Sequence, residues 1–146
     1  MSSVKPIPEG FHTVTPYLIV EGAARLIEFL RQAFGAEEIY RSPKPDGTLG
    51  HCQVRIGDSM VELADGGEQW KPMPAALHLY VPDTDATFAR AIQAGATQLF
   101  PPADTFYGDR SGGVVDPAGN QWYIATRIEN LSDEEIHARA AAVGKA

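Results

Sequence analysis

The stretch "PYLIVEGAARLIEFLRQAFGA" (residues 16–36) changes its hydrophobic period near its middle. Its first part belongs to a run of β-branched and aromatic residues, which predicts a strand over residues 12–20. From residue 21 onward the apolar side chains recur at helical spacing, and Gly35 stands where a helix commonly ends. One face of this predicted helix carries Leu26, Ile27, Leu30, Ala33 and Phe34.

The same pattern returns in "ALHLYVPDTDATFARAIQAGA" (residues 76–96), a predicted strand followed by a helix that ends at Gly95. In this second helix Phe88, Ala91 and Ile92 are expected to point inward. The two copies stand 60 residues apart at Gly35 and Gly95, and 61 apart at Val20 and Val81 and at the strands of Glu62 and Tyr123. A nearly constant offset across a helix end and two strands indicates an internal duplication.

Each copy continues with segments that favour extended chain. In the first copy these are "AEEIYRSP", "LGHCQVRI" and "SMVELA", the last two joined by a tight hairpin at Gly57-Asp58. In the second they are "ATQLF", "TFYGDRSG", "GVVD" and "QWYIATR", with turn chemistry at residues 116–120. Ser132 and Glu135 have the spacing of a capping box before a final helix.

The sequence therefore predicts an α+β fold, with two βαβββ modules whose curved mixed sheets form a cleft, plus a C-terminal helix. The modules are expected at residues 11–65 and 75–127, the linker at 66–74 and the final helix at 131–144, all within one domain.

Composition limits the partners of this chain. The net charge of −7 and the lack of a basic run argue against nucleic acid. No stretch approaches the roughly 20 apolar residues of a membrane span, and the first residues lack the layout of a secretory signal. Cys52 is the only cysteine, which excludes an intramolecular disulfide and suits a reducing compartment. We expect a cytoplasmic protein.

Four segments of residues 11–131 carry a family resemblance: "VTPYLIVEGAARLIEFLRQAFGAEE", "RIGDSMVELAD", "VPDTDATFARAIQAGA" and "FYGDRSGGVVDPAGNQWYIAT". Together they resemble the vicinal oxygen chelate superfamily of glyoxalases, extradiol dioxygenases and bleomycin-resistance proteins, and within it the PhnB-like or glyoxalase-like branch. This resemblance implies a small-molecule cleft between the modules and a homodimer, in some members with exchanged modules.

In metal-dependent members of that superfamily, the first and last strands of each module supply one ligand each. The corresponding positions here are Thr15, Glu62, Ala76 and Tyr123. Among these, Glu62 alone is a usual metal ligand, so no metal cofactor is expected. His78 lies two residues beyond Ala76 and faces the same way. As an alternative, Glu62, His78 and His51 hold a shifted divalent metal, or Glu62 and His78 act as a catalytic acid/base pair.

Further expectations concern individual side chains of the second module. Arg110 either recognises an anionic ligand through its planar guanidinium, or pairs with Asp109 or the opposite module. Trp122 is expected beneath the helix layer. The candidate ligand-binding residues are Tyr17, His51, Phe106, Tyr107, Arg110 and Tyr123.

Three functions are consistent with these residues. The first is binding of a small organic ligand without turnover. The second is catalysis by a lyase, isomerase or dioxygenase, so whether the protein is an enzyme stays open. The third is a subunit whose cleft merely supports dimerisation.

Overall fold

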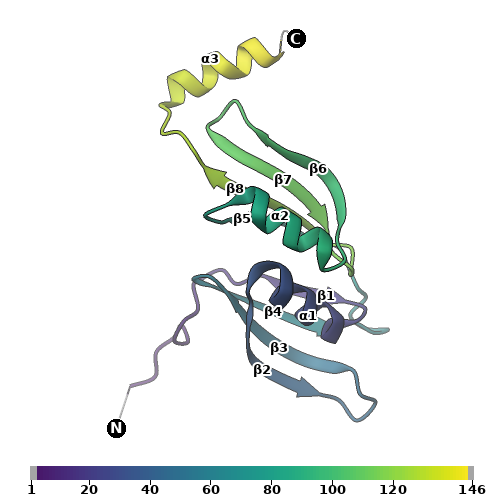
Figure 1. Cartoon of the computed structure of the whole chain (residues 1–146). Coiled ribbons are helices and arrows are strands. Elements are labelled where there is room, and N and C mark those ends of the chain that lie inside the picture. The colour runs from purple at the N-terminus through teal and green to yellow at the C-terminus, as the bar shows by residue number, and fades with distance from the viewer. Residues whose placement is uncertain (1–2, 145–146) are drawn as a thin grey trace.

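The computed structural model describes residues 3–144 and contains two four-stranded sheets and three helices (Figure 1). The predicted α+β class with two modules and a C-terminal helix is confirmed. Module 1 consists of β1 (Tyr17–Val20), α1 (Ala23–Phe34), β2 (Glu37–Pro43), β3 (Leu49–Ile56) and β4 (Ser59–Asp65). Module 2 consists of β5 (Ala76–Tyr80), α2 (Thr84–Gln93), β6 (Thr97–Asp104), β7 (Asp109–Val115) and β8 (Gln121–Arg127), and α3 (Asp133–Gly144) follows it.

The two sheets have the same topology, which confirms the duplication. Their strand orders are β1-β4-β3-β2 and β5-β8-β7-β6. In each sheet the first and last strands of the module pair in parallel, and the other neighbours are antiparallel. Tyr17 lies opposite Glu62 in the first sheet, and His78 lies opposite Tyr123 in the second. Tyr17 and His78 are 61 residues apart, and so are Glu62 and Tyr123, which is the repeat length seen in the sequence.

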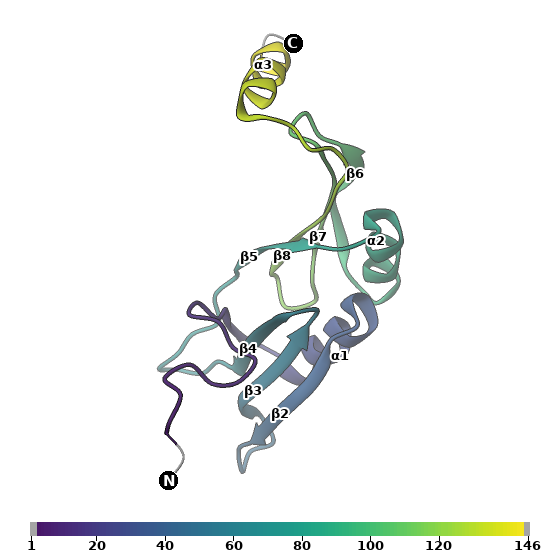
Figure 2. The ribbon, with the colours of Figure 1, turned by 90° about the vertical axis from the view of Figure 1, so that its left-hand side faces the viewer.

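Helices α1 and α2 lie beside each other on the same side of the two sheets (Figures 1 and 2). Leu26, Leu30 and Ala33 of α1 are fully buried, as their spacing predicts. The rings of Phe34 and Trp122 meet with centroids 5.0 Å apart, so these two side chains join the cores of the modules. Trp122 is buried beneath the helix layer, as expected. Within residues 3–144, no helix covers the opposite faces of the two sheets (Figures 1 and 2).

The two helix starts use different caps. Asp65 at the end of β4 accepts hydrogen bonds through Oδ1 from the backbone N–H groups of Gly22 (2.9 Å) and Ala23 (2.8 Å). Its Oδ2 accepts another from the N–H of Leu49 at 2.8 Å, so one carboxylate links α1, β3 and β4. Helix α2 is capped locally, because Asp83 accepts from the N–H of Ala86 at 3.1 Å. Side-chain acceptors satisfy helix N–H groups that have no partner within the helix.

The predicted turn at residues 116–120 is present and is built around a buried carboxylate. Asp116 Oδ1 accepts from the N–H groups of Ala118 and Asn120 at 2.8 and 3.0 Å. Its Oδ2 accepts from Trp122 Nε1 at 2.8 Å. The side-chain oxygen of Asn120 accepts from the N–H of Ala75, at the start of the second module. This turn therefore ties β7, β8 and β5 together.

Three local predictions need correction. The first strand begins at Tyr17, because Pro16 has no N–H to extend the ladder, although its carbonyl accepts from Glu62 N–H. Ile92 is exposed, since the buried stripe of α2 consists of Thr84, Thr87 and Ala91. The segment "TFYGDRSG" is not one strand: residues 105–108 form the turn between β6 and β7, and the strand starts at Asp109.

Helix α3 extends from the end of sheet β5-β8-β7-β6, away from both modules (Figures 1 and 2). Ser132 accepts from the N–H of Glu135 at 3.1 Å, as the capping-box pattern predicts. Within its bounds α3 buries none of its residues. Arg139 ties it to the body through a two-pronged ion pair with Glu129, at 2.9 and 3.0 Å. In the part of the chain that the structure describes, no helix is long and apolar enough to cross a membrane.

Candidate functional site

The helix-free face of module 1 gathers polar and aromatic side chains around His51. We call this the module-1 face, defined by Tyr17, Tyr40, His51, Gln53 and Glu62. His51 Nε2 lies 3.0 Å from Glu62 Oε2, and His51 Nδ1 lies 3.3 Å from the hydroxyl of Tyr17. A neutral imidazole with its proton on Nε2 satisfies both contacts, by donating to Glu62 and accepting from Tyr17. Glu62 is thus paired on this face.

The surroundings of His51 are partly shielded from water. The Glu62 side chain is 22% exposed and that of His51 is 33% exposed. The pKa of Tyr17 is raised above its ordinary value, first by burial of the hydroxyl and then by the nearby charge of Glu62. The phenol therefore stays protonated at neutral pH and remains a hydrogen-bond donor. A carboxylate, an imidazole and a phenol in one connected row can bind a polar ligand group or transfer a proton.

The helix-free face of module 2 is richer in aromatic surface. We call it the module-2 face, defined by His78, Tyr80, Phe100, Asp109 and Tyr123. The rings of His78 and Tyr80 have centroids 4.7 Å apart, and Phe100 stacks near Tyr123 at 6.2 Å. The Phe100 ring lies over Gly113, where an added Cβ would sit 2.8 Å from Phe100 Cδ1 and closer still to Cε1. Gly113 is therefore what allows Phe100 to lie flat on the sheet.

The positions carried over from metal-dependent relatives do not fit a divalent cation. Thr15 lies in the irregular segment before β1, and Ala76 at the start of β5 offers no donor atom. Within residues 3–144 no three His, Cys, Asp or Glu side chains are arranged to hold a metal ion. In residues 3–144 the ion pair of Glu62 is with His51, at 3.0 Å, and no ion pair joins Glu62 to His78.

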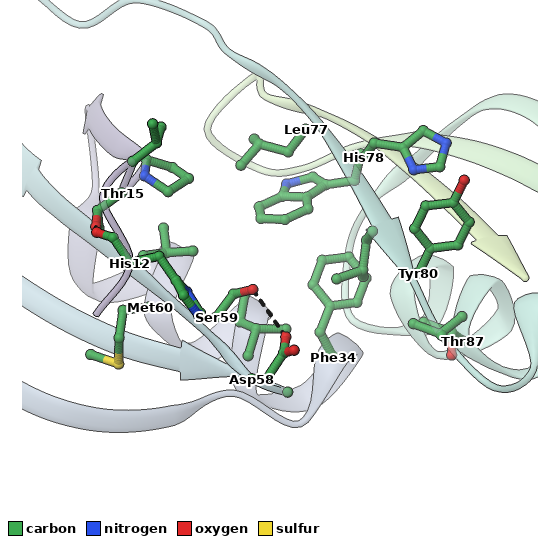
Figure 3. A pocket seen from close by; sticks show the side chains of 18 of the residues that line it. His12, Thr15, Phe34, Asp58, Ser59, Met60, Leu77, His78, Tyr80 and Thr87 are labelled. Atoms are coloured by element: carbon green, nitrogen blue, oxygen red, sulfur yellow. Dashed lines mark hydrogen bonds between the residues drawn. The ribbon is translucent and has the colours of Figure 1, made fainter. Parts of the chain in front are cut away.

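A pocket of about 610 Å³ lies between the β3–β4 hairpin and β5 (Figure 3). Phe34, Leu77 and Trp122 supply apolar lining, and Asp58 and Arg90 supply charges. His78 and Tyr80 extend along one side of it (Figure 3). Of the predicted catalytic and ligand-binding residues, His78 alone lines this pocket. The pocket is thus lined by residues of both modules, but the other predicted ligand-binding residues lie outside it.

Phe106 and Tyr107 occupy the β6–β7 turn, with their rings edge to face at 5.2 Å. Both are partly exposed at the end of the module-2 face. Two hydrogen bonds between Thr105 and Asp109 close this turn. The Thr105 N–H donates to the Asp109 carbonyl at 2.7 Å, and the Asp109 N–H donates to Thr105 Oγ1 at 3.0 Å. The two predicted ligand-binding rings thus sit on a hydrogen-bonded turn.

Arg110 is engaged by its own module. Its guanidinium donates to both carboxylate oxygens of Asp85, at 2.6 and 3.0 Å, and to Asp104 at 3.0 Å. The hydrogen bonds with Asp85 and then Asp104 raise the pKa of Arg110 above its ordinary value. The proposed pairing with Asp109 or with the opposite module is wrong, because alternation along β7 sends Arg110 and Asp109 to opposite faces.

Asp109 itself was missed as a candidate site residue. It is 1% exposed, and its Oδ2 accepts from the Tyr80 hydroxyl at 3.1 Å. Sequence reasoning treats the adjacent Asp109 and Arg110 as a mutual pair, which hides the carboxylate. The available signal was strand alternation, which places Asp109 on the same face as Gly113 and away from Arg110.

Comparison with known proteins agrees with this architecture. Residues 10–124 match the model of the Glyoxalase/Bleomycin resistance protein/Dioxygenase superfamily. An uncharacterized protein of Mycobacterium bovis is 38% identical over 142 residues, which cover 90% of this chain and 93% of the relative. The crystal structure of TioX from Micromonospora sp. ML1 aligns with a TM-score of 0.69 at 24% identity, over 80% of this chain and 99% of TioX.

A putative 3-demethylubiquinone-9 3-methyltransferase, PhnB protein, from Bacillus cereus aligns with a TM-score of 0.62 at 17% identity, over 79% of this chain and 99% of its own. At these identities the solved structures show the shared fold alone. The chain belongs to the Glyoxalase/Bleomycin resistance protein/Dioxygenase superfamily, as the resemblance of its four segments predicted.

Proposed function

We propose that this protein binds a small organic ligand in a cleft of a homodimer, between the module-1 face of one chain and the module-2 face of its partner. The observation that supports the proposal is that both faces expose aromatic rings beside ionisable side chains. Tyr17 is 47% exposed and Tyr80 is 59% exposed, beside the titratable Glu62 and His78. Exposed aromatic rings with a few polar groups are typical of small-molecule sites.

The two faces are complementary in kind. Tyr17 with Glu62 and His78 with Tyr123 occupy equivalent ladder positions, so a second copy can present one set to the other across a two-fold axis. The module-1 face then supplies the Glu62–His51 pair beside Tyr17, and the module-2 face supplies more aromatic rings together with His78 and the buried Asp109. The net charge of −7 supports a small molecule over nucleic acid as the partner. We place this dimer in the cytoplasm.

Binding in this proposal requires no divalent metal. Glu62 is the sole usual ligand among the four carried-over positions, and it is already paired with His51. Metal analysis of protein purified without chelator tests this directly. Stoichiometric metal that is lost in both Glu62→Ala and His78→Ala would overturn the proposal.

The ligand itself is sought by thermal shift. A compound that binds the native dimer selectively must raise its apparent stability, by about 2.7 kcal/mol at a hundredfold excess over Kd. A screen of aromatic metabolites and glycopeptide-like drugs, with sedimentation at each protein concentration, tests the ligand and the dimer together. A monomer at all concentrations, with no compound shifting the melt, would contradict the proposed cleft.

A second candidate function is acid/base catalysis as a lyase or isomerase. The contact of 3.0 Å between His51 and Glu62 favours it, because a carboxylate that orients an imidazole is a common arrangement for proton transfer. In this case His51 Nδ1 receives the substrate proton once the substrate displaces the Tyr17 hydroxyl. Loss of turnover in Glu62→Gln and His51→Ala, with ligand affinity retained, would favour catalysis over simple binding.

A further inference from the structure

The far end of the module-2 face holds a buried carboxylate that lacks a full set of partners. Asp109 Oδ2 accepts from the Tyr80 hydroxyl. Asp109 Oδ1, in contrast, is the one buried side-chain oxygen or nitrogen in residues 3–144 without a hydrogen-bond partner. An unsatisfied charged oxygen in a buried position is costly, and native proteins usually satisfy such atoms. The position next to Oδ1 therefore calls for a donor.

Arg127 is the cation nearest to that position, yet it does not fill it. The register of β7 and β8 sets Arg127 directly opposite Asp109. Its Nε lies 4.0 Å from Oδ1, which is beyond hydrogen-bond distance, and its side chain is 65% exposed. Arg110 and Arg139, by comparison, each make two-pronged contacts with a carboxylate. Arg127 is thus a loosely held side chain at the approach to Asp109.

The surroundings of Asp109 suit a ligand that carries both a positive charge and an aromatic ring. The Tyr80 hydroxyl donates to the carboxylate and the Tyr80 ring lies against the His78 ring, while Phe106 and Tyr107 stand on the adjoining turn. The pKa of Tyr80 is raised, mainly by burial and then by its hydrogen bond to Asp109, so the phenol keeps donating to Oδ2. Aromatic faces attract cations, and a net charge of −7 favours their approach.

We propose that Asp109 anchors a protonated amine carried by an aromatic ligand, and that the ligand displaces Arg127 from the approach to Oδ1. The amine donates to Oδ1, while the aromatic body lies against Tyr80 and Tyr107. This inference rests on the proposed ligand-binding function and names the chemical class of the ligand. In this proposal the Asp109 carboxylate strengthens binding of the amine, and the Arg127 cation weakens it by competing for Oδ1.

The test compares tryptamine with tryptophol, which share an indole body and differ in carrying an ammonium or a hydroxyl group. Affinities are measured by calorimetry on the full chain at neutral pH and low salt. We expect the wild type to prefer tryptamine by about tenfold, corresponding to about 1.4 kcal/mol. Asp109→Asn keeps an acceptor for Tyr80 and should abolish this preference. Arg127→Ala should strengthen tryptamine binding several-fold, because it removes the competing cation.

A matched control is Asp104→Asn, which removes a carboxylate of the same module that already pairs with Arg110. It should leave the preference for tryptamine unchanged, and melting curves confirm that each variant is folded. Equal binding of both probes to the wild type, or an unchanged preference in Asp109→Asn, overturns the cation site and leaves the ligand-binding function standing. Failure of both probes to bind the wild type and Arg127→Ala counts against both proposals.

Discussion

Replacing Asp65 by Ala should destabilise the protein more than removing the cap of the second helix. Asp65 accepts three backbone hydrogen bonds, from Gly22, Ala23 and Leu49. Ala23 and Leu49 are buried, so water cannot replace their lost acceptors, whereas Gly22 is exposed. At about 1–2 kcal/mol for each buried N–H left unpaired, Asp65→Ala should cost about 3 kcal/mol.

The matched control is Asp83→Ala, which removes one hydrogen bond to the exposed start of α2. Loss of such a cap costs about 1 kcal/mol. In a chain of this size each kcal/mol lowers Tm by about 2–4 °C, so we expect a fall of about 6–12 °C for Asp65→Ala and about 2–4 °C for Asp83→Ala. Asp65→Asn should fall between them, because its amide oxygen can still accept from Ala23.

Urea unfolding at one fixed protein concentration, followed by circular dichroism, gives the free energies of unfolding. The reasoning would be refuted if Asp65→Ala were no more destabilising than Asp83→Ala. That result would mean that the three hydrogen bonds of Asp65 stabilise the fold no more than the single hydrogen bond of an ordinary helix cap. The packing of α1 and β3 against β4 would then not depend on this side chain.

Three other predictions concern the faces and the final helix. Gly113→Ala should cost about 1–3 kcal/mol because the new methyl group displaces the Phe100 ring, and the cost should shrink in a Phe100→Ala background, as a double-mutant cycle in urea would show. Because the folded-state pKa values of Tyr17 and Tyr80 are raised above 10.0, their contribution to stability is present below pH 10 and is lost as the pH rises through the folded values. Urea unfolding between pH 9 and 11 should show this fall, and Tyr80→Phe should reduce its slope. Arg139→Ala should speed amide exchange in α3 with no change in the Tm of the modules; a slow α3 would contradict its attachment through this side chain.

The sequence by itself determined the parts of this protein that depend on near neighbours along the chain. The spacing of Leu26 and Leu30 predicts α1, Gly35 predicts its end, and the turn at residues 116–120 follows from its Asp, Pro, Gly and Asn. The offset of 60 to 61 residues predicts the duplication, because each copy repeats the same local signals. These features require no knowledge of which strands pair.

Only the tertiary structure decided which side chains meet. Strand register brings Glu62 to His51 and sets Arg127 opposite Asp109, although each pair is separated in the sequence. The packing of α1 beside α2 leaves the two candidate faces on separate sheets and places the pocket along β5. Such contacts depend on long-range pairing and on the burial of whole faces, which the periodicity of a single segment does not encode.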